Sequence, residues 1–188
     1  MDGGVGYGSR YEHSDMGNTL AALEAIYHSR GLVNRDQAGG GEPDLNWAAA
    51  IHFLERCQNL KSHNPEPWAS EDPKQKGGFI YYPGHSMAGA ETNAANGRVA
   101  LRSYGSITYG GLLSYIYADL KPDDPRVGGA FDWLRRNYTL DENPGMGPQG
   151  MYYYFHTMAK TLSLMKIRQL ELADGRKIDW GRELAMKL

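Results

Sequence analysis

Near its middle the chain reads Tyr109-Gly-Gly-Leu-Leu-Ser-Tyr-Ile-Tyr117, and an earlier stretch, Thr19-Leu-Ala-Ala-Leu-Glu-Ala-Ile-Tyr27, overlays it without a gap. Both stretches place apolar residues three and four positions apart, the spacing of one face of an α-helix. A second overlay matches residues 48–59 with residues 128–139. Self-similarity of this kind is typical of a protein built from repeated units. The two overlays predict a recurring pair of helices.

Apolar periodicity and capping signals place helices along the whole chain. Ser14 or Asp15 is available as the N-cap of the first helix, and Asp124 precedes Pro125 at the start of the fourth. Each pair of helices follows a glycine turn, at residues 2–7, 76–81 and 143–147. Helices are expected at roughly 18–31, 43–59, 105–120, 125–138, 148–172 and 179–188.

The expected fold is therefore all-α, with about three helical hairpins in one domain over residues 1–188. The repeats are expected at roughly 1–60, 76–140 and 141–188. A long loop at 61–103 interrupts them, and a loop of this length is uncommon in a compact domain unless it is functional or mobile. Its centre, Gly77-Gly-Phe-Ile-Tyr-Tyr82, alternates well enough for a short extended segment, and its flanks are typical of solvated loop.

Composition and charge narrow the classes of partner. The chain has 188 residues, with 20 basic and 22 acidic side chains and no block of like charge, so nucleic acid is not an expected partner. No apolar stretch approaches the ~18 residues that span a bilayer, and no signal peptide is visible, so we expect a soluble protein, cytoplasmic by default. Tyrosine is abundant, with 13 residues against four phenylalanines, which favours apolar surfaces that also need a hydroxyl.

A glycine-aromatic turn, an inner helix and an outer helix follow one another in Gly77-Gly-Phe-Ile-Tyr-Tyr82, Ser103-Tyr-Gly-Ser-Ile-Thr-Tyr-Gly-Gly-Leu112 and Tyr138-Thr-Leu-Asp-Glu-Asn-Pro-Gly-Met-Gly147. This order resembles the prenyltransferase and squalene-oxidase repeat of the terpenoid cyclase and protein prenyltransferase superfamily. The resemblance implies an α/α toroid whose inner helices line a cavity, and the chain is similar to its C-terminal half. A half-toroid would expose its end hairpins, so either two copies close the ring as a homodimer, the chain is a piece of a longer protein, or an open crescent is tolerated. Self-association through the end hairpins is expected.

The sequence contains only parts of the catalytic and metal-binding motifs of that superfamily. The cyclase motif Asp-x-Asp-Asp is nearest to Lys121-Pro-Asp-Asp-Pro125, which departs from the pattern. The string Tyr154-Phe-His-Thr157 resembles the zinc-binding histidine motif of the prenyltransferases, but residues 102–106 contain neither the Asp nor the Cys that should accompany it. A lone histidine holds zinc poorly, so no metal and no cofactor is expected. The candidates for a catalytic role are His156, Tyr152, Asp141 and Glu142.

The predicted function is binding of an apolar or isoprenoid-like small molecule on a concave, tyrosine-lined face, because aromatic rings suit such a ligand. One alternative is a non-catalytic helical-repeat module that binds a protein partner. A further alternative is a carbohydrate-active α/α-toroid enzyme, which would need paired carboxylates beside aromatic platforms. The predicted ligand-binding residues are Tyr81, Tyr82, Tyr104, Tyr109, Tyr152, Tyr153 and His156.

Overall fold

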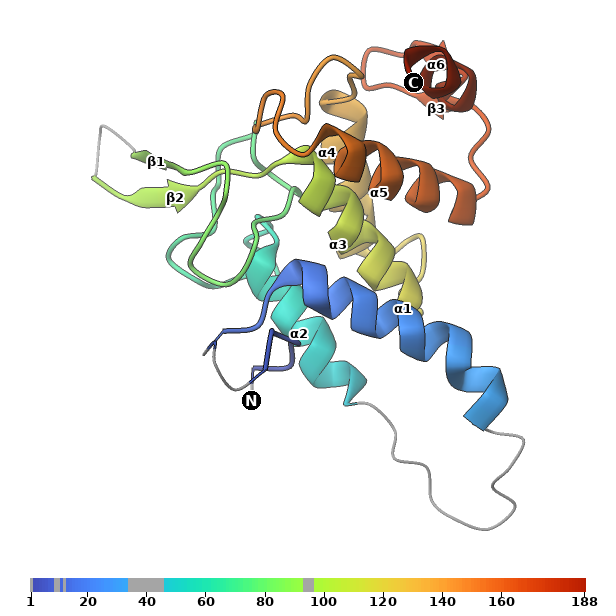
Figure 1. The fold of residues 1–188 in the computed structure, drawn as a ribbon. Coiled ribbons are helices and arrows are strands. Elements are labelled where there is room, and N and C mark those ends of the chain that lie inside the picture. Colours follow the sequence, from blue (N-terminus) through green and yellow to red (C-terminus); the bar gives the residue numbers. More distant parts are fainter. Residues whose placement is uncertain (1, 9–10, 12, 34–45, 93–96) are drawn as a thin grey trace.

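The computed structural model describes residues 2–8, 11, 13–33, 46–92 and 97–188 (Figure 1). Its helices are α1 (Met16–Val33), α2 (Trp47–Cys57), α3 (Gly105–Tyr117), α4 (Pro125–Arg136), α5 (Met151–Leu164) and α6 (Trp180–Lys187). Its strands are β1 (Ala90–Thr92), β2 (Val99–Leu101), β3 (Leu170–Glu171) and β4 (Lys177–Ile178). β1 pairs with β2 and β3 with β4, each pair antiparallel.

The strands correct the predicted fold class. The expectation of an all-α half-toroid of helical hairpins is wrong, because two small antiparallel sheets accompany the helices and make the fold mixed. Part of the error lies in residues 148–172, which were expected to form one helix. Leu170 and Leu172 are buried whereas Glu171 is exposed, which is the alternation of a strand. Asp174-Gly175 then turns the chain back into β4, with Gly175 at a φ of 86°.

Helix α5 ends early for a local reason. Lys166 adopts a left-handed backbone conformation with a φ of 57°. Its N–H donates to the carbonyl of Ser163 at 3.0 Å, and the N–H of Ile167 donates to the carbonyl of Leu162 at 3.0 Å. These two bonds form a Schellman motif, which closes a helix and turns the chain away. Glycine usually occupies the left-handed position, so a lysine there leaves no sequence signal for the helix end.

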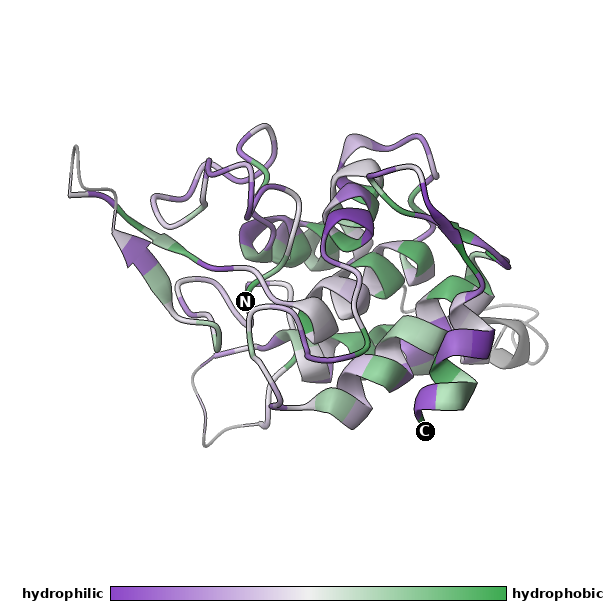
Figure 2. Ribbon diagram, turned by 90° about the horizontal axis from the view of Figure 1, so that it is seen from above, coloured by the Kyte–Doolittle hydropathy of each residue, from purple (hydrophilic) through white to green (hydrophobic). Residues whose placement is uncertain are grey.

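Helix α3 lies at the centre of the core and packs against α1, α4 and α5 (Figure 1). Twelve of its residues are buried, and Figure 2 shows apolar residues along the helices of this core. Gly111 lets the chain approach closely here, because a Cβ at this position would lie 2.6 Å from the ring of Phe79. Asp119, which has a φ of 61°, and Leu120 close the helix with a second Schellman motif.

Two glycine turns make the same contact with different helices. Gly3 has a φ of +89°, and a Cβ on it would lie 1.9 Å from the carbonyl oxygen of Ala49. Gly77 has a φ of +94°, and a Cβ on it would lie 2.0 Å from the carbonyl oxygen of Gly129. Only glycine fits such an approach. Residues 49 and 129 also stand opposite each other in the predicted overlay of 48–59 on 128–139.

The inner helices correspond in a different register from the predicted one. The N–H of Val5 donates to Thr19 Oγ1 at 2.9 Å, and the N–H of Phe79 donates to Thr108 Oγ1 at 3.0 Å. Thr19 therefore corresponds to Thr108, whereas the sequence overlay had aligned it with Tyr109. The shift is one position, about 100° around a helix, which a short alignment of leucines and alanines does not resolve.

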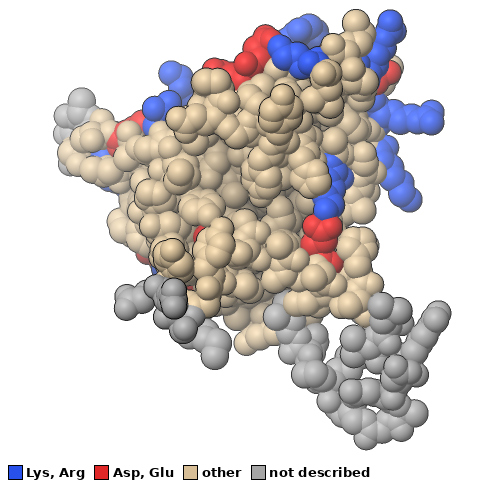
Figure 3. All heavy atoms as spheres, viewed as in Figure 1, with Lys and Arg blue, Asp and Glu red and all other residues tan. Residues whose placement is uncertain are grey.

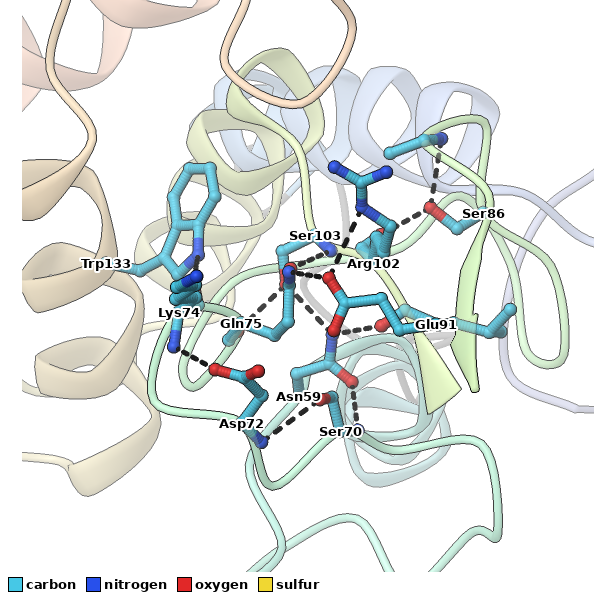
Figure 4. Close-up of polar contacts among 12 residues, drawn as sticks. Asn59, Ser70, Asp72, Lys74, Gln75, Ser86, Glu91, Arg102, Ser103 and Trp133 are labelled. Atoms are coloured by element: carbon cyan, nitrogen blue, oxygen red, sulfur yellow. Dashed lines mark hydrogen bonds and ion pairs between the residues drawn. The ribbon is translucent and has the colours of Figure 1, made fainter. Parts of the chain in front are cut away.

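A buried polar network holds the segment 61–103 (Figure 4). Asn64, in the first of the two flanks that were expected to be solvated, is buried, whereas Gly89, Ala90 and Thr92 in the second are exposed. Asn59 Nδ2 donates to the carbonyl of Leu101 and to Ser103 Oγ, both at 2.9 Å, and its Oδ1 accepts the N–H of Ser70 at 2.7 Å. The N–H of Ser103 donates to Gln75 Oε1 at 2.8 Å. Such buried groups need these partners, and the network joins the segment to the helical core.

No helix among the described residues is long and apolar enough to cross a membrane. The predicted N-terminal capping of α1 and α4 is confirmed, since the N–H of Asn18 donates to Asp15 at 2.9 Å and that of Arg126 donates to Asp124 at 2.9 Å. The start expected for the second helix, residues 43–45, lies outside the described residues. The homodimer stays a prediction.

Candidate functional site

A cavity of about 580 Å³ lies at the N-terminal ends of α1, α3 and α5. Residues of the turns that precede these helices also line the cavity, so it is formed by side chains from separate parts of the chain. The face in Figure 3, with α1 and α5 in its foreground, carries few charged side chains across its centre. The largest side chains that line the cavity are Tyr7, Tyr81, Met87, Tyr104, Met146 and Tyr153.

Tyr104 is the most buried of these aromatic residues, with 5% of its surface exposed. It is the residue before α3, and its N–H donates to the carbonyl of Phe79 at 3.3 Å. No described residue forms a hydrogen bond with the Tyr104 hydroxyl. Burial raises the pKa of this phenol well above its usual value, so the hydroxyl stays protonated at neutral pH and can donate to a ligand.

Behind the tyrosines lies the carboxylate of Asp15, which is 1% exposed. Asp15 is the N-cap of α1 and accepts the N–H of Asn18 at 2.9 Å and its Nδ2 at 2.6 Å. The Tyr81 hydroxyl forms a further side-chain hydrogen bond with it. Burial, and after it the charge of Asp15, raises the pKa of Tyr81 to about 12. The carboxylate is therefore satisfied from two sides, by helix α1 and by the cavity wall.

Tyr153, in the first turn of α5, is a further tyrosine of the cavity lining. It is 42% exposed, and burial together with the charge of Asp15 raises its pKa. Tyr104 in turn interacts electrostatically with Tyr81, Tyr153 and Asp15. The three tyrosines come from a turn, from the start of α3 and from α5, and all three were predicted from the sequence as ligand-binding residues.

The wall between α3 and α5 is fixed by Asn143. Its Oδ1 accepts the N–H of Ser106 at 2.9 Å, and its Nδ2 donates to Ser106 Oγ at 3.1 Å. The N–H of Gly105 donates to the carbonyl of Pro144 at 2.8 Å. These bonds tie the turn at 143–147 to the start of α3 and so position Met146 at the cavity. Sequence reasoning missed Asn143, although its place in the third glycine turn was a usable signal.

Two residues expected in the hollow do not line it. The side chain of Tyr152 is 81% exposed, and His156, one turn further along α5, is also exposed. The inward face of α5 is formed instead by Tyr154, Met158 and Thr161, which are buried. Because Tyr152 and His156 are four residues apart, both point away from the core together. The expectation that they face a shared cavity is therefore wrong.

The other predicted site residues lie elsewhere. Tyr109 is fully buried in the core beside the ring of Tyr154, at a centroid distance of 5.7 Å. Tyr82 stacks between His13 and His85, at 4.3 Å and 4.8 Å between ring centroids. These positions leave both outside the cavity lining.

The acidic pair was considered for catalysis because neighbouring carboxylates can act as acid and base. Asp141 is exposed and pairs with Lys187 at 2.9 Å, and Glu142 is exposed beside it. Neither residue lines the tyrosine cavity. Among the described residues there is no group of three His, Cys, Asp or Glu side chains that could hold a metal ion.

A larger hollow of about 880 Å³ lies between the end of α5 and the start of α6. Its lining includes Lys166, Arg168, Asp179 and Trp180, and none of the predicted site residues belongs to it. Most of these side chains are exposed, whereas ligand sites are usually concave and mostly apolar with a few convergent polar groups. The tyrosine cavity fits that description better in spite of its smaller volume.

No protein-family model, no curated protein sequence and no solved structure matches this chain. The resemblance to the terpenoid cyclase and protein prenyltransferase superfamily therefore stays an expectation from the sequence.

Proposed function

We propose that this protein binds an apolar or isoprenoid-like small molecule with a polar head group in the tyrosine cavity. The volume of about 580 Å³ falls within the range of roughly 300–1,000 Å³ that is typical of small-molecule sites. Tyrosine rings and the thioethers of Met87 and Met146 supply an adaptable apolar surface. The phenol hydroxyls supply the polar contacts.

The observation that carries the proposal is the hydroxyl of Tyr104. The hydroxyl is not enclosed by protein, because the enclosed side-chain oxygen without a partner among the described residues is that of Tyr109. A ligand in the cavity can therefore reach it. Tyr104 lines a cavity large enough for a ligand, and its hydroxyl forms no hydrogen bond with a described residue. A ligand head group placed there would accept a hydrogen bond from this phenol while its apolar part contacts the surrounding rings.

The experiment is a calorimetric titration with geraniol, a neutral isoprenoid alcohol. We expect saturable binding to the unaltered protein, and Tyr153→Ala is expected to weaken it about tenfold or more, because a large aromatic contact worth about 1.5 kcal/mol or more is lost. Tyr152→Ala is the matched control. It removes the same side chain from the neighbouring position of the same helix turn, where the ring is exposed.

The control is expected to bind geraniol as the unaltered protein does. If geraniol fails to bind, or if both alanine variants lose the same affinity, the tyrosine cavity is not the site. Tyr104→Phe tests the polar contact separately, since it keeps the ring and removes only the hydroxyl. Its expected effect is a smaller loss, about threefold to tenfold, the worth of one hydrogen bond.

A further inference from the structure

The cavity carries an unusual distribution of charge. The described residues that line it include no lysine, arginine, histidine, aspartate or glutamate. The buried carboxylate of Asp15 lies next to it, because Asn18 lines the cavity and its Nδ2 donates to Asp15 at 2.6 Å. Asp15 forms no ion pair with a described residue. A ligand in the cavity therefore lies close to a negative charge.

Tyr81 connects that charge to the cavity. Its hydroxyl is hydrogen-bonded to Asp15, and its side chain also lines the hollow. A phenol that donates its only proton to a carboxylate becomes more polarised, and its oxygen keeps lone pairs that accept from a ligand. The rings of Tyr81, Tyr104 and Tyr153 also present π systems, which attract cations within about 6 Å.

Groups that would favour an anion are mostly occupied. The amides at the start of α1 are capped by Asp15, and Asn143 accepts the N–H of Ser106 at the start of α3. Helix α5 has no side-chain cap, so its N-terminus keeps about half a positive charge. That partial positive charge would attract an anionic ligand, but it is smaller than the full negative charge of Asp15.

Resting on the proposed function, we infer that the ligand of this cavity carries an ammonium head group, with Tyr81 accepting its N–H and Asp15 supplying the counter-charge. The apolar part of the ligand then lies against Met87, Met146 and Tyr153. An amine is favoured over an alcohol because it adds charge attraction and cation–π contacts to the same apolar contacts. A diphosphate or carboxylate head would face Asp15 with no lysine or arginine in the lining.

The test compares geranylamine, geraniol and geranate at neutral pH, three probes with one isoprenoid chain and a positive, neutral or negative head. The unaltered protein is expected to bind geranylamine about tenfold more tightly than geraniol and more tightly still than geranate. Asp15→Asn is expected to bring the ratio of the geranylamine and geraniol affinities close to one, because it removes the counter-charge. Asparagine caps helices about as well as aspartate, so the substitution is expected to preserve α1.

Asp141→Asn is the matched control, because it removes the same charge from an exposed residue that pairs with Lys187 outside the cavity. It is expected to leave the preference for geranylamine unchanged. Equal affinities for the three probes, or tightest binding of geranate, would overturn the ammonium assignment and leave small-molecule binding standing. If none of the three probes binds, the proposed function fails as well. An equal loss of preference in both asparagine variants would also overturn the assignment, since net charge alone would then explain it.

Discussion

At the scale of single residues, Tyr109 and Tyr115, two of the three buried tyrosines of α3, differ in the contacts of their hydroxyls. The Tyr115 hydroxyl donates to Gln58 Oε1 at 3.0 Å, whereas the Tyr109 hydroxyl has no hydrogen-bond partner among the described residues. Burial raises the pKa of both side chains well above the usual value. A buried hydroxyl stabilises the fold when it is hydrogen-bonded and destabilises it when it is not. The two hydroxyls should therefore contribute to the free energy of unfolding with opposite sign.

We expect Tyr115→Phe to lower the free energy of unfolding by about 1–2 kcal/mol, because it leaves the side chain of Gln58 without this partner. Tyr109→Phe removes an unpaired hydroxyl and is expected to leave stability unchanged or raise it by up to about 1 kcal/mol. Urea unfolding followed by circular dichroism measures both. A loss for Tyr109→Phe as large as that for Tyr115→Phe would show that the Tyr109 hydroxyl has a partner after all.

The cavity tyrosines show how far sequence reasoning reaches at this scale. Tyr81, Tyr104 and Tyr153 could be proposed because aromatic rings suit an apolar ligand and the family resemblance implies a cavity lined by the inner helices. Tyr152 was proposed on the same grounds and is exposed, although it adjoins Tyr153. Neighbouring residues on a helix point about 100° apart, so the choice between them depends on which side meets the core. Asp15 was predicted as a cap, but its place behind Tyr81 depends on the tertiary fold.

At the scale of elements, the helices with regular apolar spacing were predictable, but the end of α5 was not. α3 and α4 lie close to their predicted ranges, because Asp124-Pro125 and the leucine spacing mark them clearly. The α5 helix was extended by several residues because Lys166 occupies the left-handed position of its Schellman motif. Asp174-Gly175 is a typical turn of a β-hairpin and indicated β3 and β4. The regular apolar spacing of α5 led instead to the prediction of one long helix.

Lys166 provides a test of that explanation. A non-glycine residue in the left-handed region costs about 1 kcal/mol relative to glycine, so Lys166→Gly is expected to raise the free energy of unfolding by about 0.5–1 kcal/mol. Lys166→Ala is the control, because alanine keeps the Cβ that causes the strain and should bring no gain. Chemical denaturation distinguishes the two. Equal effects of glycine and alanine would mean that the backbone at Lys166 is not what limits α5.

At the scale of the whole molecule, the central helix and the long segment together form the cavity. α3 is buried between α1 and α5, so the starts of these three helices meet at one end of the core. The segment 61–103 contributes Tyr81 and Met87, and the network around Asn59 holds it in place (Figure 4). The sequence predicted the helices but not this network, since its bonds join residues up to 44 positions apart.

The central claim is that a small molecule occupies the space between these three helix starts. Methyl NMR of protein labelled at its methionines tests it directly, because Met87 and Met146 line the cavity. Met158 is buried on the inward face of α5, and Met186 is exposed on α6, so these two methyl groups serve as internal references. We predict that geraniol shifts the signals of Met87 and Met146 in a saturable way and leaves the references unchanged. Unshifted Met87 and Met146 signals in the presence of bound geraniol would contradict the account.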